Sequence, residues 1–403
     1  MIELLAPAGD LEKLKIAILY GADAVYLGGR QFGLRAGAGN FEQEQLVEGV
    51  RFAHARAARV YVTVNIFAHN PDLELMPDYL AAILEAGVDG VIMSDPGLVD
   101  LVRKLHPGLP VHLSTQANTT NWAAARFWQE LGVVRIVLAR ELSLDEIKEI
   151  NARVQVDLEV FVHGAMCMAY SGRCLLSNYL TGRDANRGDC AQSCRWQYAL
   201  QEEKRPGEYF PVEEDDRGTY ILSSRDLCLI EHIPALVGAG VNSFKIEGRM
   251  KSANYVAGVV RTYRAALDTY QKDPHSYRFD PAWLEAIGKV SHRNYTTGFM
   301  FGSPGAAGQH YGAGIYQRSH IFVGLVRDYD HSTGLALVEQ RNRFAVGDLL
   351  EVMVPDGNDF IQKITEIIDA EGLLVEAAPH PRQWVKVPFD RPVSPYAIIR
   401  KIV

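Results

Sequence analysis

The sequence lacks long apolar runs, an excess of positive charge and, outside one region, cysteine. No segment of the 403-residue chain approaches the roughly 20 apolar residues that a membrane span requires, so we expect no membrane segment. The formal net charge is −8, so a nucleic acid would need a local basic surface to bind. The first residues lack a basic segment followed by an apolar one. They predict a buried strand rather than a signal peptide, and we expect a cytoplasmic protein.

Several motifs with well-understood chemistry are also missing. There is no His-Glu-x-x-His helix of a zinc protease and no Gly-x-Ser-x-Gly turn of a serine hydrolase. The glycine-rich loop 28–40 is not a dinucleotide fingerprint, because Glu42 stands where a third glycine is required after Gly37 and Gly39. We interpret the loop as a flexible cover over a binding site, with Arg35 as a candidate for anion binding. A solvated loop with a surface arginine is the alternative.

All the cysteines of the chain lie in one region, at Cys167, Cys174, Cys190, Cys194 and Cys228. In a chain without a secretion signal, clustered thiols more often bind a metal or a cluster than form disulfides. The spacing is not the paired Cys-x-x-Cys of zinc ribbons, and soft thiolates at irregular spacing suit an iron–sulfur cluster at least as well. An iron–sulfur cluster and zinc therefore both remain candidates, and a disulfide is the least favoured.

The first two-thirds of the sequence alternates short apolar runs with segments of helical periodicity. The apolar runs are typical of strands buried on both faces of a parallel sheet. Such strands are predicted at Ile2–Ala6, Ala24–Leu27, Val60–Val64, Gly90–Met93, Val111–Ser114, Val134–Leu138, Leu158–Val162 and Phe244–Glu247. Helices are predicted at residues 10–21, 42–57, 77–86, 121–131, 143–151 and 253–270, with Pro77 at a first helical position. This order favours an α/β fold with a TIM-type (β/α)8 barrel over an open doubly wound sheet.

The domain organisation follows from where this alternation stops. We expect a TIM-like barrel at residues 1–275 that carries a Cys-rich insertion at about 164–222, then a connecting segment at 276–318. The last part of the chain, 319–403, predicts a small C-terminal β-barrel domain, because its apolar segments alternate and are separated by Asp/Gly turns. These segments are residues 321–326, 335–339, 349–354, 373–376 and 397–402.

Polar residues follow most of the predicted barrel strands, where the active sites of TIM barrels are found. They are Asn65, Ser94, Gln116, Arg140, His163, Glu247 and Arg249, with Lys245 inside the last strand. Such a set suits a small anionic or amide-rich ligand, although the same residues can also close internal hydrogen-bond networks. A buried cation needs a partner, which for Lys245 and Arg249 is either Glu247 or a ligand carboxylate. His163 could also activate Cys167 as a nucleophile, but this pair leaves the other cysteines unexplained.

Several motifs resemble those of the U32 peptidase-like (collagenase-like) family. They are Leu5-Ala-Pro-Ala-Gly9, Glu159-Val-Phe-Val-His-Gly-Ala-Met-Cys167, Gly172-Arg-Cys174-Leu-Leu-Ser177, Asn186-Arg-Gly-Asp-Cys190-Ala-Gln-Ser-Cys194-Arg-Trp196, Ser224-Arg-Asp226-Leu-Cys228, Lys245-Ile-Glu-Gly-Arg249-Met-Lys-Ser252 and Tyr295-Thr-Thr-Gly-Phe299. The resemblance runs essentially end to end and is closest to the prephenate-dependent tRNA uridine 5-hydroxylation subgroup.

The resemblance implies an RNA-modifying enzyme, a tRNA wobble-uridine 5-hydroxylase with prephenate or a related dicarboxylate as co-substrate. It also implies a [4Fe–4S] cluster on Cys167, Cys174, Cys190 and Cys228, with Cys194 as the alternate fourth ligand. The catalytic residues are not identified, and the candidates are His163, Glu159 and Glu247. The candidates for substrate binding are Arg35, Asn65, Gln116, Lys245 and Arg249. In the β domain the candidates for phosphate contacts are Arg341, Arg343 and Lys363, for which a solvated surface is the alternative. A protein partner or a homo-oligomer is also expected. The alternatives are a collagenase-like peptidase and a binding module stabilised by zinc.

Overall fold

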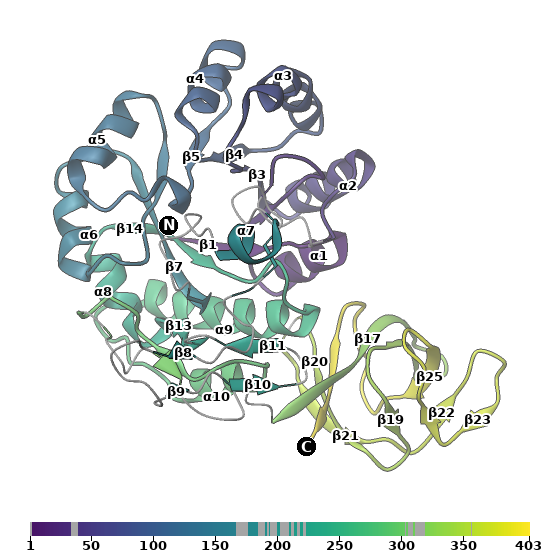
Figure 1. Cartoon of the computed structure of the whole chain (residues 1–403). Coiled ribbons are helices and arrows are strands. Elements are labelled where there is room, and N and C mark those ends of the chain that lie inside the picture. Colours follow the sequence, from purple (N-terminus) through teal and green to yellow (C-terminus); the bar gives the residue numbers. More distant parts are fainter. Residues whose placement is uncertain are drawn as a thin grey trace.

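The computed structural model describes residues 2–403 apart from 34–38, 167–175, 184–189, 192, 194–199, 202–208, 211–212, 216–217, 221–222, 303, 305–308, 311–318 and 356. Figure 1 shows a barrel ringed by helices and, beside it, a second domain made of strands. None of the helices in this described part has the length and apolar character required to span a bilayer.

Parallel strands follow one another around the barrel in chain order. They are β1 (Glu3–Pro7), β2 (Ala24–Leu27), β3 (Arg59–Val64), β4 (Gly90–Met93), β5 (Val111–Leu113), β6 (Arg135–Val137), β7 (Asp157–Ala165) and β14 (Val241–Ile246). The last strand pairs with both the first strand and β7, which closes the barrel. The predicted TIM-type barrel is confirmed, and the open doubly wound sheet is wrong.

Helices cover the outside of the barrel (Figure 1). They are α1 (Leu11–Leu19), α2 (Gln43–His54), α3 (Asn70–Glu85), α4 (Pro96–Leu105), α5 (Trp122–Glu130), α6 (Leu144–Asn151), α8 (Ile233–Gly238) and α9 (Ala253–Lys272). Side-chain caps fix several of their starts. The Asp10 carboxylate accepts a hydrogen bond from the backbone N–H of Lys13, and Ser143 forms a capping box with Glu146.

Two details of the helix prediction are wrong. The third helix begins at Asn70 rather than at Pro77, because Pro71 occupies its first turn and Asp72 caps the backbone of His69. Pro77 lies inside this helix, where the proline nitrogen removes one backbone hydrogen bond. Helix α4 was not predicted, although Asp95 caps its first turn and Pro96 stands at its start.

The insertion after β7 returns to the barrel and extends one edge of it. Strand β13 (Asp226–Cys228) pairs antiparallel with the end of β7, and β15 (Tyr295–Thr296) pairs with β13. The other described elements between the barrel and the second domain are α7 (Leu176–Thr181), β8 (Leu200–Gln201), β9 (Tyr209–Phe210), β10 (Glu213–Asp215), β11 (Gly218–Tyr220), β12 (Ser223–Ser224), α10 (Ala282–Gly288) and β16 (Gln309–His310).

The C-terminal domain is an antiparallel sheet curved into a half-barrel, which confirms the predicted C-terminal β domain. From edge to edge the sheet contains β21 (Phe360–Lys363), β20 (Leu349–Met353), β26 (Ile398–Ile402), β17 (His320–Asp330), β18 (Leu335–Gln340), β25 (Trp384–Pro388), β22 (Ile367–Ile368) and β23 (Leu374–Val375). A short pair, β19 (Phe344–Ala345) and β24 (Ala377–Ala378), lies beside it. Strands β21 and β25 were not predicted.

The two domains share a core and several polar contacts. Leu325, Met353 and Ile398 of the β domain are buried in the same hydrophobic cluster as the barrel. The Tyr20 hydroxyl of α1 donates a hydrogen bond to the backbone oxygen of Met353 at 2.7 Å. Arg341, which was predicted as a phosphate contact, instead lies 2.7 Å from a carboxylate oxygen of Glu12 in α1.

Candidate active site at the mouth of the barrel

Lys245 lies inside the barrel rather than at its mouth. Its ammonium nitrogen is 2.6 Å from a carboxylate oxygen of Glu159, and both side chains are almost completely buried. Burial alone would raise the pKa of Glu159, but Lys245 and Arg135 hold this pKa below its usual range. The two residues therefore neutralise each other in the interior of the barrel.

The same ion pair belongs to a larger buried network at the start of the strands. The Arg135 guanidinium donates to Glu3 and, at 3.4 Å, to Glu159. The Ser243 hydroxyl lies 3.1 Å from a carboxylate oxygen of each glutamate. Each charge in this network faces an opposite charge, as buried ions require. The sequence reasoning missed Glu3 and Arg135, because their positions looked like ordinary strand residues.

Arg249 lies at the mouth, as predicted, and is only 4% exposed. Its guanidinium donates to the Thr63 hydroxyl at 3.2 Å and to the Asn40 side-chain oxygen at 2.8 Å. These two oxygens hold the guanidinium in place at the mouth. Glycine at position 28 makes room for it, because a Cβ there would lie 2.3 Å from an Arg249 nitrogen. The chain thus keeps a buried cation next to the glycine-rich loop.

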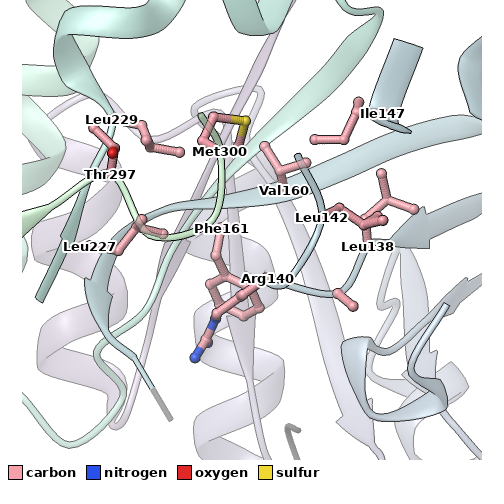
Figure 2. Close-up of a pocket in the computed structure, with 11 residues that line it drawn as sticks. Leu138, Arg140, Leu142, Ile147, Val160, Phe161, Leu227, Leu229, Thr297 and Met300 are labelled. Carbon is pink, nitrogen blue, oxygen red and sulfur yellow. The ribbon is translucent and has the colours of Figure 1, made fainter. Parts of the chain in front are cut away.

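Arg140 and Glu247 form the second charged pair of the mouth. The Arg140 guanidinium is 3.1 Å from the Glu247 carboxylate and donates to the backbone oxygen of Ala165 at 3.0 Å. Figure 2 shows this guanidinium alongside the ring of Phe161, with 3.9 Å between the guanidinium carbon and the ring centre. The pocket beside Arg140 has a volume of about 10 Å³, which is roughly the room of one water molecule. This pocket is too small for a dicarboxylate or a nucleobase.

A row of polar side chains joins the ends of β3, β4 and β5. The Asn65 amide donates to the Ser114 hydroxyl at 3.4 Å, and the Ser94 hydroxyl donates to the backbone oxygen of Asn65 at 3.4 Å. Gln116 follows in a short 3-10 turn and is 8% exposed. Its side-chain oxygen is buried and has no hydrogen-bond partner among the described residues. The structure thus joins Asn65 and Ser94, and the backbone N–H of Gln116 donates to the same Ser114 hydroxyl at 3.4 Å.

His163 stands at the end of β7 inside a cage of aromatic rings. The ring centres of Tyr255, Tyr263 and Tyr295 lie 5.9, 5.6 and 5.4 Å from that of the histidine. Burial lowers the pKa of His163 to about 3, so the imidazole is neutral at physiological pH. A neutral buried imidazole can accept or donate a single proton, but it cannot provide a positive charge for a ligand.

Cys228 is placed directly opposite His163 in the β7–β13 pairing. Its side chain is buried, and its sulfur lies 3.9 Å from the Tyr263 hydroxyl. Cys190 is exposed. Cys167, Cys174, Cys194 and Arg35 lie outside the described residues. Within the part that the structure describes, no group of three or more His, Cys, Asp or Glu side chains could hold a metal ion.

The sequence reasoning missed an ion pair behind Cys228. Two nitrogens of the Arg293 guanidinium lie 3.0 and 2.8 Å from one carboxylate oxygen of Asp226, and both side chains are almost fully buried. Burial would raise the pKa of Asp226, but Arg293 holds it below its usual range. The pair fixes β13 against the segment that leads into β15. Asp226 was visible in the Ser-Arg-Asp motif, but nothing in the local sequence pointed to Arg293 as its partner.

The fold and this mouth define a TIM-type barrel protein with buried arginines at the ends of its strands and a β domain docked beside it. The profile of peptidase family U32 matches residues 9–310, and that of the peptidase family U32 C-terminal domain matches residues 318–400. The chain therefore belongs to peptidase family U32.

Relatives of the chain carry three kinds of name. tRNA hydroxylation protein P1 of Bacillus subtilis (strain 168) is 46% identical, with 99% of this chain and 94% of the relative covered. The 23S rRNA 5-hydroxycytidine C2501 synthase of Escherichia coli (strain K12) is 36% identical, with 84% and 53% covered. A protein named Collagenase, from Porphyromonas gingivalis (strain ATCC BAA-308 / W83), is 35% identical, with 91% and 89% covered.

Proposed function

We propose that this chain is an RNA-modifying enzyme that hydroxylates tRNA at C5 of the wobble uridine, with prephenate as co-substrate and a [4Fe–4S] cluster as cofactor. The observation that carries the proposal is the 46% identity to a tRNA hydroxylation protein over 94% of that relative's length. The mouth supports it, because a buried cation and a row of amides stand at the same end of the barrel. A dicarboxylate and a nucleobase need these two kinds of group.

Arg249 would bind a carboxylate of prephenate. Its guanidinium is planar, offers several N–H donors and is already oriented by Thr63 and Asn40. Burial strengthens its attraction for an anion, because little water competes. Arg140 is less suited to this role, since the Glu247 carboxylate lies 3.1 Å away. We assign this pair the task of holding the ends of β6 and β14 in position beside the substrate.

The amide row would bind the base. A uridine must leave its stack before an enzyme can reach C5, so the mouth has to accept an extruded base. The buried Gln116 oxygen, which lacks a partner among the described residues, would accept a hydrogen bond from uracil N3–H. The Asn65 amide would donate to a uracil carbonyl oxygen after giving up its long contact to Ser114.

Cysteines would hold the cluster at the same end of the barrel. When bound, a [4Fe–4S] cluster supplies one-electron transfer, and its iron atoms require thiolate ligands. Cys228 fits this role, because its sulfur is enclosed where β13 meets the end of β7. Cys190 would be a second ligand, with Cys167 and Cys174 completing the set and Cys194 as the alternate. The Asp226–Arg293 pair would keep β13, and with it Cys228, in register.

A collagenase-like peptidase is the second candidate, favoured by the name of the relative at 35% identity. A peptidase needs an activated nucleophile or a metal-bound water. His163 is the candidate base, but its ring is 1% exposed and surrounded by tyrosines. A zinc-stabilised binding module, the third candidate, would contain zinc and no iron.

One experiment separates these candidates. Protein purified without oxygen would be analysed for iron, zinc and acid-labile sulfide, and tested for restoring 5-hydroxyuridine to tRNA in a bacterial strain that lacks this modification. We expect about four iron and four sulfide per chain and restored hydroxyuridine. The Cys228→Ser variant should lose both, whereas the Arg249→Gln variant should keep the cluster and lose the modification. Zinc without iron, or collagen cleavage without tRNA modification, would overturn the proposal.

A further inference from the structure

Strand β25 carries an aromatic side chain and a cation on its outer face. Val385 and Val387 point into the core of the β domain and are each 1% exposed. Trp384 and Lys386 alternate with them and point outward, and Trp384 is 45% exposed. An outward tryptophan contributes nothing to the core of the domain. Its exposed ring is therefore available to a binding partner.

The segment that carries Trp384 contains cations and no acidic residue between Glu376 and Asp390. Residues 377–389 contain Arg382 and Lys386 and no Asp or Glu, whereas the whole chain has a net charge of −8. Arg382 is exposed at the turn that leads into β25. The spacing of i and i+2 along a strand places Trp384 and Lys386 about 7 Å apart. We call Arg382, Trp384 and Lys386 the β25 row.

A chain of contacts connects this row to the barrel. Trp384 lies directly opposite Glu339 of β18 in the antiparallel pairing. The Glu339 carboxylate is held by Arg327, and Arg327 also contacts Glu12 in the first turn of α1. Glu12 is thus neutralised at the junction, and Glu339 does not leave a free negative charge beside the row.

The first turn of α1 in turn lies next to the mouth. A Cβ on Gly9, which precedes this helix, would lie 2.1 Å from the backbone oxygen of Arg249. One strand pairing and two ion pairs therefore link Trp384 to the first turn of α1, at the Arg249 end of the barrel.

We propose that the β25 row is an RNA-contact surface, with Trp384 stacked on an unpaired base and with Arg382 and Lys386 on phosphates; this rests on the proposed RNA substrate. Aromatic rings between cations are the usual means of binding unpaired nucleotides, because every base offers a face for stacking. A loop of tRNA presents such bases next to the nucleotide that enters the mouth. The row would hold the loop while the barrel receives the target uridine.

Another strand of the same sheet provides a matched control for Trp384. The edge strand β21 exposes an apolar residue, Ile361, at 57% exposure. It lies at one end of the strand order, whereas β25 is an interior strand that pairs with β18 and β22. Lys363 of β21 is one of the phosphate contacts expected from the sequence, so it does not serve as a control. The substitution of Ile361 removes an exposed apolar side chain that the proposal does not involve.

The test measures binding of unmodified tRNA by the full chain over a series of salt concentrations. We expect Trp384→Ala to weaken binding by about tenfold without changing the salt dependence, since base stacking contributes about 1–3 kcal/mol. Lys386→Ala should weaken binding and lower the slope of log K against log salt by about one, as the loss of one phosphate contact requires. Trp384→Tyr should retain most of the affinity. Ile361→Ala should bind tRNA like the wild-type protein.

Equal binding by the β25 and β21 variants would overturn the proposal, as would a wild-type chain that does not bind tRNA. A loss of tRNA affinity that results from misfolding would be accompanied by a lower midpoint of thermal unfolding. The surface variants of β25 and β21 should leave this midpoint unchanged. The hydroxyuridine content of tRNA is measured separately. If the Trp384→Ala variant binds tRNA with unchanged affinity and still modifies it, only this inference is overturned. If the wild-type protein binds tRNA but does not modify it, only the proposed activity is overturned.

Discussion

The Arg140 guanidinium and the Glu247 carboxylate, 3.1 Å apart, connect the carboxyl ends of β6 and β14 across the strand that lies between them. Only 6% of the Arg140 side chain and 19% of that of Glu247 are exposed, so the pair is shielded from solvent. A single ionic contact thus ties together three adjacent strand ends at the candidate active site.

Breaking this pair should destabilise the barrel. In Glu247→Gln the buried Arg140 loses its counter-charge, and we expect the free energy of unfolding in urea to fall by about 1–3 kcal/mol. The double variant with Arg140→Gln should lose less than the sum of the two single variants, because neither charge is then left alone. Additive losses would mean that the two side chains do not interact.

Gly28→Ala should displace Arg249. The new methyl group would lie 2.3 Å from a guanidinium nitrogen, so the arginine must move away from Thr63 and Asn40. We expect the KM for prephenate to rise by about tenfold or more, while kcat and the thermal midpoint change less. Gly108→Ala is the control, because nothing lies within 4 Å of a Cβ at that position. An unchanged KM in Gly28→Ala would remove Arg249 from the carboxylate site.

His112 should make the protein sensitive to acid. Burial, followed by the charge of Arg135, lowers its pKa in the folded state to about 3, from 6.5 in the unfolded chain. Between these values the unfolded state binds the extra proton, so the free energy of unfolding falls as pH decreases, by about 1.4 kcal/mol per pH unit from this group. The contribution is fully present above pH 6.5 and is lost progressively towards pH 3.

The variant His112→Phe isolates this effect, because phenylalanine can keep the packing against the Tyr61 ring, 4.5 Å away, but cannot be protonated. Urea unfolding between pH 4 and 7 should give a shallower pH dependence for the variant than for the wild type. The nearby Lys245 and Arg59 also disfavour the protonated histidine, while Glu159 favours it, and all three remain in the variant. Parallel pH profiles would contradict the assignment.

Tyr263→Phe should change the environment of Cys228 without opening the barrel. The hydroxyl lies 3.9 Å from the Cys228 sulfur and donates to the backbone oxygen of Val162 at 2.7 Å. The single hydroxyl proton is donated to Val162, so Tyr263 acts on the sulfur through the polarity of its hydroxyl group. The variant makes the surroundings of the proposed cluster less polar, which should shift its reduction potential to a more negative value. The measurement is a redox titration followed by electron paramagnetic resonance. An unchanged potential with full iron content would mean that Tyr263 acts on the backbone alone.

The barrel could be predicted because its information is local. Nearly continuous Val, Ile and Leu runs such as residues 60–64 and 90–93 mark strands covered on both sides, and helix-length segments separate them. Pro77 misled the prediction because a proline at the start of a helix and one inside it look alike in sequence, and the stronger start signal lay earlier, at Pro71. Strand β25 was not predicted, because its alternation of apolar and polar residues is short and is flanked by prolines.

The site could be predicted only in part, because its partnerships join distant residues. The strand-end rule found Arg249, Arg140 and Glu247, since it depends on position alone. Lys245 was placed inside the last strand, and its partner Glu159 lies 86 residues away in the sequence. No local sequence pattern indicates that the charge of Lys245 is neutralised by a distant glutamate.

The shared core beneath the β domain has a mechanical consequence. With Leu325, Met353 and Ile398 buried among barrel residues, the contact between the described parts of the two domains is packed like a core, so the domains should move together. The distance between Trp384 and Arg249 is then constant. An RNA that touches both points is selected by how far its anchored base lies from its target nucleotide, in addition to its sequence.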